Sequence, residues 1–124
     1  MVHEFRAAGV SVSFASDNCR DPFYAYGDHD MMEVYREAVR IAHLDHPYGT
    51  WIASVNATPA ASCGFVEAGR VTVGARANLI LFRARSMTEL LARPQSDRVI
   101  LRNGKPLDAA VPDFREMDAV LGVL

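Results

Sequence analysis

Asp17 is the residue of this chain whose position is most typical of chemistry. It follows residues 10–14, a run of β-branched, aromatic and small residues without charge, which predicts a strand buried on both faces of a parallel sheet. Ligands and catalytic groups collect at the carboxyl ends of such strands. A carboxylate there could bind a cation or transfer a proton. The alternative is an Asx turn, in which Asp17 only caps nearby backbone.

Two other groups of side chains could serve a site. The loop after Asp17 contains Phe23, Tyr24 and Tyr26, which either pack down on the core or form the wall of a pocket for a planar substrate. His43 and His46 lie three residues apart near the end of a predicted helix, where histidines also favour the negative end of the helix dipole. Because no third ligand has compatible spacing, we do not expect a metal site there.

Four segments carry a resemblance to a known family. They are residues 14–24 (FASDNCRDPFY), 31–34 (MMEV), 56–61 (NATPAA) and 69–81 (GRVTVGARANLIL). The first resembles the last barrel strand and following loop of the cytosine deaminase branch of the metal-dependent amidohydrolases. The last resembles the stretch where such enzymes return to a small β-sandwich, and it recurs across many amidohydrolases.

The resemblance implies an α/β fold, the C-terminal fragment of a (β/α)8 barrel with its last strand and helix, followed by short helices and strands of an accessory β-sandwich. Residues 1–64 would be the last βα unit with its following helices, and residues 65–124 the β-rich return segment. A complete barrel needs about 250 residues, whereas this chain has 124. We therefore expect a fragment.

The resemblance also implies site roles. Asp17 matches the carboxylate that binds a divalent metal ion, zinc or iron, and shuttles protons during hydrolytic deamination. Asn18 would contact the substrate and Phe23 would line the pocket. The family draws its other ligands from earlier strands, notably a His-x-His pair, and no such pair occurs here. We expect the metal and the activity in the full-length parent, and neither in this chain alone.

The sequence departs from the family at the substrate side. Bacterial cytosine deaminases carry Gly-His-Asp-Asp where this chain has residues 15–18, and a Trp at the position of Phe23. Asn18 can donate as well as accept hydrogen bonds, which changes the ring that the site prefers. The expected substrate is a cytosine-like ring, a related pyrimidine or triazine, or another small cyclic amine.

A rival hypothesis is a complete, non-catalytic protein, a truncated gene product or interaction module that kept the fold elements but not the metal site. Under the fragment hypothesis the last barrel strand would lack its neighbours. The chain should then self-associate or pair with the missing N-terminal portion.

Composition limits the remaining classes. A net charge of −2 with scattered Lys and Arg gives no footprint for nucleic acid. No apolar run reaches the ~20 residues of a membrane span. Cys19 and Cys63 follow no secretory signal and are expected as reduced thiols in a cytoplasmic protein, although a disulfide stays open. Cys63 is expected to be buried.

The clearest predicted helix covers residues 31–43, with Asp30 and Glu33 as a capping box and an apolar stripe toward the sheet. The stripe consists of Met31, Val34, Tyr35, Ala38, Ile41 and Ala42. A helix over residues 1–8 would end at Gly9, and short helices are predicted at 50–55 and, capped by Thr58, at 59–63.

The second half is predicted to be β-rich. Strands are expected at 70–73, 78–82 and 98–102, with Asn103-Gly104 as a hairpin turn after the last. Ser86 and Glu89 form a capping box for a helix ending at Ala92. A further helix is expected near 114–120.

Overall fold

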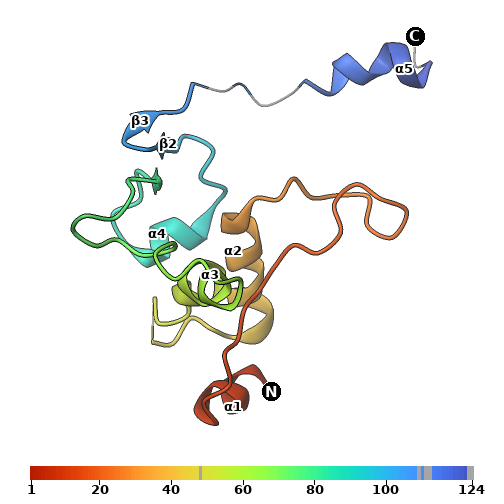
Figure 1. The fold of residues 1–124 in the computed structure, drawn as a ribbon. Coiled ribbons are helices and arrows are strands. Elements are labelled where there is room, and N and C mark those ends of the chain that lie inside the picture. The colour runs from red at the N-terminus through yellow and green to blue at the C-terminus, as the bar shows by residue number, and fades with distance from the viewer. Residues whose placement is uncertain (48, 109, 111–112, 123–124) are drawn as a thin grey trace.

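The computed structural model describes residues 1–47, 49–108, 110 and 113–122. Figure 1 shows several short helices near one longer helix, a small sheet beside them, and the C-terminal helix away from the rest. In chain order the elements are α1 (Val2–Ala7), α2 (Met31–Ala42), η1 (Ile52–Val55), α3 (Ala57–Ser62), β1 (Leu79–Leu81), α4 (Met87–Ala92), β2 (Val99–Arg102), β3 (Lys105–Pro106), η2 (Phe114–Met117) and α5 (Asp118–Leu121).

The core forms around α2. Met32, Tyr35 and Val39 of this helix are buried together with Leu44 and Trp51. The spacing of the three helical residues places them on one stripe. Val12 and Phe14 from the N-terminal part and Phe82, Leu90 and Leu91 from the second half pack against this cluster. Both halves of the chain therefore meet on α2.

The predicted helix is confirmed, but its buried stripe is rotated from the predicted one. Ile41 is 78% exposed, whereas Met32 and Val39, which were absent from the predicted stripe, are buried. The helix ends at Ala42 because His43 adopts a left-handed conformation, with φ 52°, and donates its backbone N–H to Val39 O. Helical spacing fits more than one stripe of apolar residues in this segment. Packing against Trp51 and Leu44 determines which of these residues are buried.

The predicted N-cap is confirmed, since Asp30 accepts from Met32 N at 3.0 Å. The reciprocal half of the capping box is not formed by Glu33. The backbone N–H of Asp30 instead donates to Asp28 Oδ1 at 3.0 Å. Asp28, two residues before Asp30, therefore accepts the hydrogen bond that Glu33 would have accepted in a capping box.

Helix α1 ends as predicted, with Gly9 at φ 81°. Residues 10–14, predicted as a strand, belong to no ladder, because they have no strand partner in the described part of the chain. A strand is assigned by pairing, and local apolar content alone does not supply a neighbour. The N–H of Phe14 donates to Ser54 O at 3.0 Å.

Trp51 connects α1 and the extended segment to the core. Its ring lies edge-on to His3, with centroids 5.3 Å apart, and 6.4 Å from the ring of Phe14. The guanidinium of Arg6 lies 4.5 Å above the Trp51 ring. These contacts hold the N-terminal residues against the body formed by α2.

Between Trp51 and the second half the chain forms η1 and α3. Helix α3 begins two residues before the predicted start, because Asn56 rather than Thr58 is its N-cap. Cys63, predicted to be buried, is exposed, and both cysteines are free thiols. Gly69 passes close to the start of α3: a Cβ added there would lie 2.6 Å from the carbonyl carbon of Asn56.

The sheet is antiparallel and has the order β1-β2-β3. Leu79 pairs with Leu101 and Ile80 with Ile100. The hairpin predicted at Asn103-Gly104 is confirmed, with φ of 50° and 77° at its two turn residues. The strand predicted at 70–73 is wrong, since these residues are assigned to no strand.

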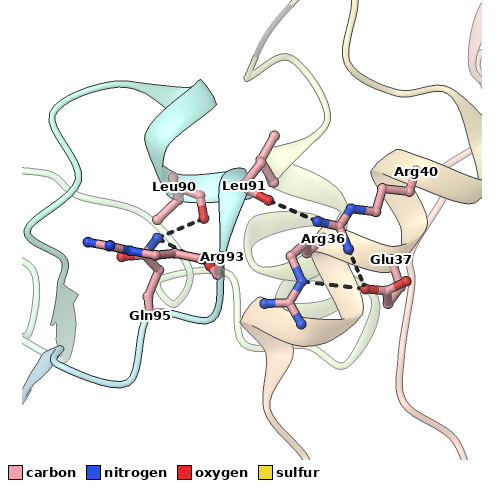
Figure 2. Close-up of polar contacts among 7 residues, drawn as sticks. All are labelled: Arg36, Glu37, Arg40, Leu90, Leu91, Arg93 and Gln95. Carbon is pink, nitrogen blue, oxygen red and sulfur yellow. Dashed lines mark hydrogen bonds and ion pairs between the residues drawn. The ribbon is translucent and has the colours of Figure 1, made fainter.

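Helix α4 begins as predicted, with Ser86 Oγ accepting from Glu89 N. Its C-terminal end is held by side chains from elsewhere, as Figure 2 shows. The buried Gln95 amide donates to the carbonyls of Glu89, Leu90 and Arg93. Arg40 reaches across from α2 to Leu91 O at 3.4 Å. Free carbonyls at a helix end need such donors.

The helix predicted near 114–120 appears as η2 followed by α5. These elements lie away from the core in Figure 1, beyond the sheet. The ring of Phe114 is covered by the guanidinium of Arg20, 4.0 Å from the ring centroid. None of the helices in the described ranges has the length and apolarity needed to cross a membrane.

Candidate functional site

The extended segment before Asp17 presents two different faces. Val12, Phe14 and Ser16 are half-buried, whereas Ser11, Ser13 and Ala15 are exposed. This alternation is the period of a strand, in which successive side chains point to opposite sides. Asp17 follows in phase with the exposed face. The segment therefore packs one face on α2 and presents the other, with Asp17 at its end, to the outside.

Asp17 has an unusual backbone conformation. Its φ is 59°, in the left-handed region, and its side chain is exposed. Within the described part of the chain its carboxylate makes no hydrogen bond or ion pair. The Asx-turn alternative is therefore not supported by a contact of this side chain. Asp21 forms that kind of turn instead, because its Oδ1 accepts from the backbone N–H groups of Phe23 and Tyr24.

Left-handed residues gather around this loop. Of the five described non-glycine residues with positive φ, three lie here, namely Asp17, Arg20 and His29. Each costs roughly 1–2 kcal/mol for an L-residue, although Asp and His tolerate it better than most. Such strain persists where surrounding contacts fix it and is frequent at functional sites. The loop is thus held in a defined shape by its contacts.

Those contacts are local and converge on Gly27. Its carbonyl accepts from Cys19 Sγ and from Arg20 Nε, both at 3.1 Å. The backbone N–H of Arg20 donates to Tyr26 O at 3.0 Å. These hydrogen bonds therefore join the two arms of the loop, at residues 19–20 and 26–27.

The structure places the two predicted substrate residues differently. Asn18 is half-buried beside Asp17, and its Nδ2 donates to Asp21 Oδ1 at 3.2 Å. Phe23 is 89% exposed at the loop tip, and Tyr26 is 72% exposed. Phe23 and Tyr26 do not pack on the core, so that alternative is wrong for these two residues. Phe23 and Asp17 belong to one loop, but no contact joins them.

A small cavity of about 260 Å³ lies between this loop and α2. Sequence reasoning did not identify it. Its lining includes Ser16, Tyr24, His29, Asp30 and Glu33, but not Asp17. Ser16 Oγ lies 3.5 Å from His29 Nδ1, which brings the two arms of the loop together. The only sequence signal for this contact was the abundance of short polar residues on both arms.

Asp30 has a second partner that the sequence did not predict. Arg98, just before β2, donates from Nη1 to Asp30 Oδ1 at 2.8 Å and from Nη2 to Oδ2 at 2.5 Å. Hydrogen bonds from this guanidinium hold the pKa of the Asp30 carboxyl below its usual value, and partial burial opposes them. Residues 68 positions apart give no local pattern from which this pair could be found.

The described residues do not form a complete metal centre. No group of three or more His, Cys, Asp or Glu among them could hold a metal ion. His43 and His46 are included in this finding. The unengaged carboxylate of Asp17 fits the role of one oxygen ligand, and the other ligands would have to come from residues outside the described part.

A larger cavity of about 950 Å³ lies on another side of the molecule. It is lined by parts of α2, η1, the 64–76 loop, β1 and α4, and its lining is mostly apolar. None of the residues from Asp17 to Phe23 contributes to it. The lining of this cavity is therefore separate from the Asp17 loop.

The chain is similar to known proteins over most of its length. The model of the Amidohydrolase family matches residues 1–108. A pterin deaminase of Rhizobium rhizogenes is 57% identical over 122 residues, which are 98% of this chain and 28% of that protein.

Among solved structures, the crystal structure of 5-methylcytosine deaminase from Klebsiella pneumoniae, liganded with phosphonocytosine, has a TM-score of 0.69 at 26% identity. The match covers 90% of this chain and 28% of that one. The chain thus spans little more than a quarter of the length of either relative. With most of its length matched by the family model, the chain belongs to the amidohydrolase family.

Proposed function

We propose that the protein containing this chain is a metal-dependent aminohydrolase that removes an amino group from a cyclic, pyrimidine-containing amine by hydrolysis. The observation that carries the proposal is the exposed, unengaged carboxylate of Asp17 at the end of an extended segment. It occurs in a chain 57% identical to a protein named pterin deaminase.

The likeness to that protein favours a pterin over a single-ring substrate. The relative named for 5-methylcytosine shares 26% identity with this chain, less than half as much. Both named substrates contain a pyrimidine ring with an exocyclic amino group. We infer that this shared amino-pyrimidine unit is what the site recognises, with a second fused ring in the preferred substrate.

The reaction replaces an exocyclic amine with an oxygen. Water adds to the ring carbon that bears the amino group, the carbon–nitrogen bond breaks, and ammonia leaves. Asp17 takes a proton from the water and delivers a proton to the departing nitrogen, so the carboxylate ends as it began.

Members of this family are generally metal-dependent. A bound divalent ion, zinc or iron, would lower the pKa of the attacking water. Asp17 would be one of its ligands, and a carboxylate is suited to both tasks because it stays anionic beside a cation. Asn18 would hydrogen-bond the ring from the neighbouring position, and Phe23 would cover its face.

The test uses the protein encoded by the complete reading frame that contains these residues. Purified with zinc or iron, it should release ammonia from pterin faster than from 5-methylcytosine or cytosine. Asp17→Ala should lower kcat at least about a hundredfold, the scale of losing a proton-transfer group. Asp108→Ala, the same change at an exposed carboxylate outside the site, is the matched control.

Two results would count against the proposal. Ammonia release by Asp17→Ala at the rate of Asp108→Ala would remove Asp17 from the reaction. A protein that releases no ammonia from any of the three substrates, with either metal, would favour the non-catalytic alternative.

A further inference from the structure

Arg98 and Asp30 form the ion pair that joins the second half of the chain to the loop bearing Asp17. Two parallel N–H···O contacts connect the guanidinium and the carboxylate. Each side chain is only 23% exposed. Bidentate pairs of this kind are geometrically specific, because the planar fork fixes both partners.

Asp30 has a second task at the same time. Its Oδ1 also accepts from Met32 N at 3.0 Å and so caps α2. The carboxylate is therefore held from two directions, by the first turn of α2 and by Arg98. A side chain held in this way fixes the backbone that carries it.

That backbone is the returning arm of the loop. His29, directly before Asp30, has φ 62°, and its Nδ1 lies 3.5 Å from Ser16 Oγ. Ser16 directly precedes Asp17. Arg98 thus contacts Asp30, and the adjacent His29 contacts Ser16. Because Ser16 is bonded to Asp17, these contacts connect Arg98 to the backbone of Asp17.

We propose that Arg98 is a positioning residue for Asp17, acting through Asp30 to hold the 17–29 loop in its left-handed, closed shape. The consequence for catalysis rests on the proposed function; the consequence for loop closure does not. Arg98 touches no part of the loop tip and takes no part in the chemistry.

Among the described residues, the other ion pairs do not combine two such contacts with low exposure and a large separation in sequence. Arg85, two residues before the start of α4, pairs with Glu89 at 2.9 Å, and the Arg85 side chain is 86% exposed. Exposed pairs of this kind contribute little to stability. Glu89→Gln is therefore a matched control, because it removes an ion pair of similar length that lies apart from the loop.

The variants separate the ion pair from the helix cap. Asp30→Asn keeps an N-cap acceptor, since Asn caps helices about as well as Asp, but loses the charge that Arg98 pairs with. Arg98→Met keeps most of the side-chain length and leaves the cap unchanged. If the two residues act together, the double variant should be no more affected than either single one.

The first measurement is limited digestion by chymotrypsin well below the unfolding temperature. Phe23, Tyr24 and Tyr26 are exposed at the loop tip, so cleavage there reports how often the loop opens. Both single variants should be cut about tenfold faster within residues 20–27, the scale of losing a charge-assisted hydrogen bond, with cleavage elsewhere unchanged. Glu89→Gln should match the wild type.

The second measurement is steady-state deamination by the protein from the complete reading frame. Both variants should lower kcat about tenfold, with KM changed less than about twofold, because they displace Asp17 more than they alter substrate contacts.

The outcomes are distinguishable. Faster cleavage at the loop with a protein that deaminates nothing would leave the loop-holding role intact while the proposed function fails. Cleavage equal to that of Glu89→Gln, or raised equally along the whole chain, would overturn the positioning role. So would an active enzyme whose kcat does not change in Arg98→Met.

Discussion

At the scale of single residues, the same side-chain type has a proposed catalytic role at Asp17 and a structural role at Asp30. The carboxylate of Asp17 is exposed and has no partner in the described residues. That of Asp30 accepts three hydrogen bonds, two of them from Arg98. A carboxylate free of partners is available for chemistry, whereas one that is fully engaged is available for structure. Chemical type alone did not distinguish them.

The engagement of Asp30 predicts a pH dependence of stability. Its folded-state pKa is lowered from 3.8 by hydrogen bonds from Arg98. A group with a lowered folded pKa contributes stability above its unfolded pKa and loses it as pH falls through the folded value. The free energy of unfolding should therefore fall as pH drops below 3.8, and Asp30→Asn should lose this component.

Urea denaturation from about pH 6 to about pH 2 measures the effect. The wild type should be more stable than Asp30→Asn at the upper end, and the difference should shrink toward the lower end. A difference that stays constant over the whole range would show that Arg98 does not stabilise the ionised carboxyl.

At the scale of elements, two glycines of the 64–76 loop differ in what surrounds them. Gly69 and Gly74 both have positive φ, 70° and 84°. A Cβ at Gly74 would meet nothing within 4 Å, whereas one at Gly69 would lie 2.6 Å from the Asn56 carbonyl carbon and 2.7 Å from Ala57 N. Only Gly69 lets the loop approach the start of α3.

Comparing alanine substitutions at Gly69 and Gly74 isolates the loss of stability that comes from the close approach at Gly69. Gly74→Ala should destabilise by about 1–2 kcal/mol through its left-handed conformation alone. Gly69→Ala should cost at least about 2 kcal/mol more, because backbone rather than a flexible side chain must move. Denaturation midpoints with m-values compare them, and equal losses would mean that the loop does not pack on α3.

Local signals in the sequence predicted local structure well. The Asp30 and Ser86 caps and the Asn103-Gly104 hairpin are confirmed, since each depends on residues within a few positions. The strand predicted at 70–73 is wrong and residues 10–14 form no ladder, because pairing depends on partners that local pattern does not specify.

The candidate site divides in the same way. Motif and strand-end logic led to Asp17, whose exposure is compatible with the role assigned to it. The sequence did not lead to Arg98, which reaches the loop from 68 residues away. Nor did it indicate that Asp21 rather than Asp17 forms the turn, since both have the residue type that turns favour.

At the scale of the whole molecule, much apolar surface is uncovered. Val10 is 52% exposed, and the cross-strand partners Ile80 and Ile100 are 47% and 40% exposed. The extended segment 10–14 also has backbone groups without a strand partner in the described residues. Such surface favours association, with other copies or with a complementary segment.

Light scattering on the purified 124-residue chain should give a mass above that of a monomer, increasing with concentration. Ile100→Lys should reduce the association, because it places a charge on the apolar sheet face. Ser96→Lys adds the same charge at an exposed position outside the sheet and should not. A chain that stays monomeric at every concentration would contradict this expectation.

The packing of Trp51 has a practical consequence. It is the one tryptophan of the chain and is 4% exposed, and its indole touches residues of both α1 and the segment that leads to Asp17. Fluorescence excited selectively at tryptophan therefore originates from this junction. A red shift in emission would signal that water has reached the indole. The packing of the segment that leads to Asp17 can thus be followed in real time without attaching a dye.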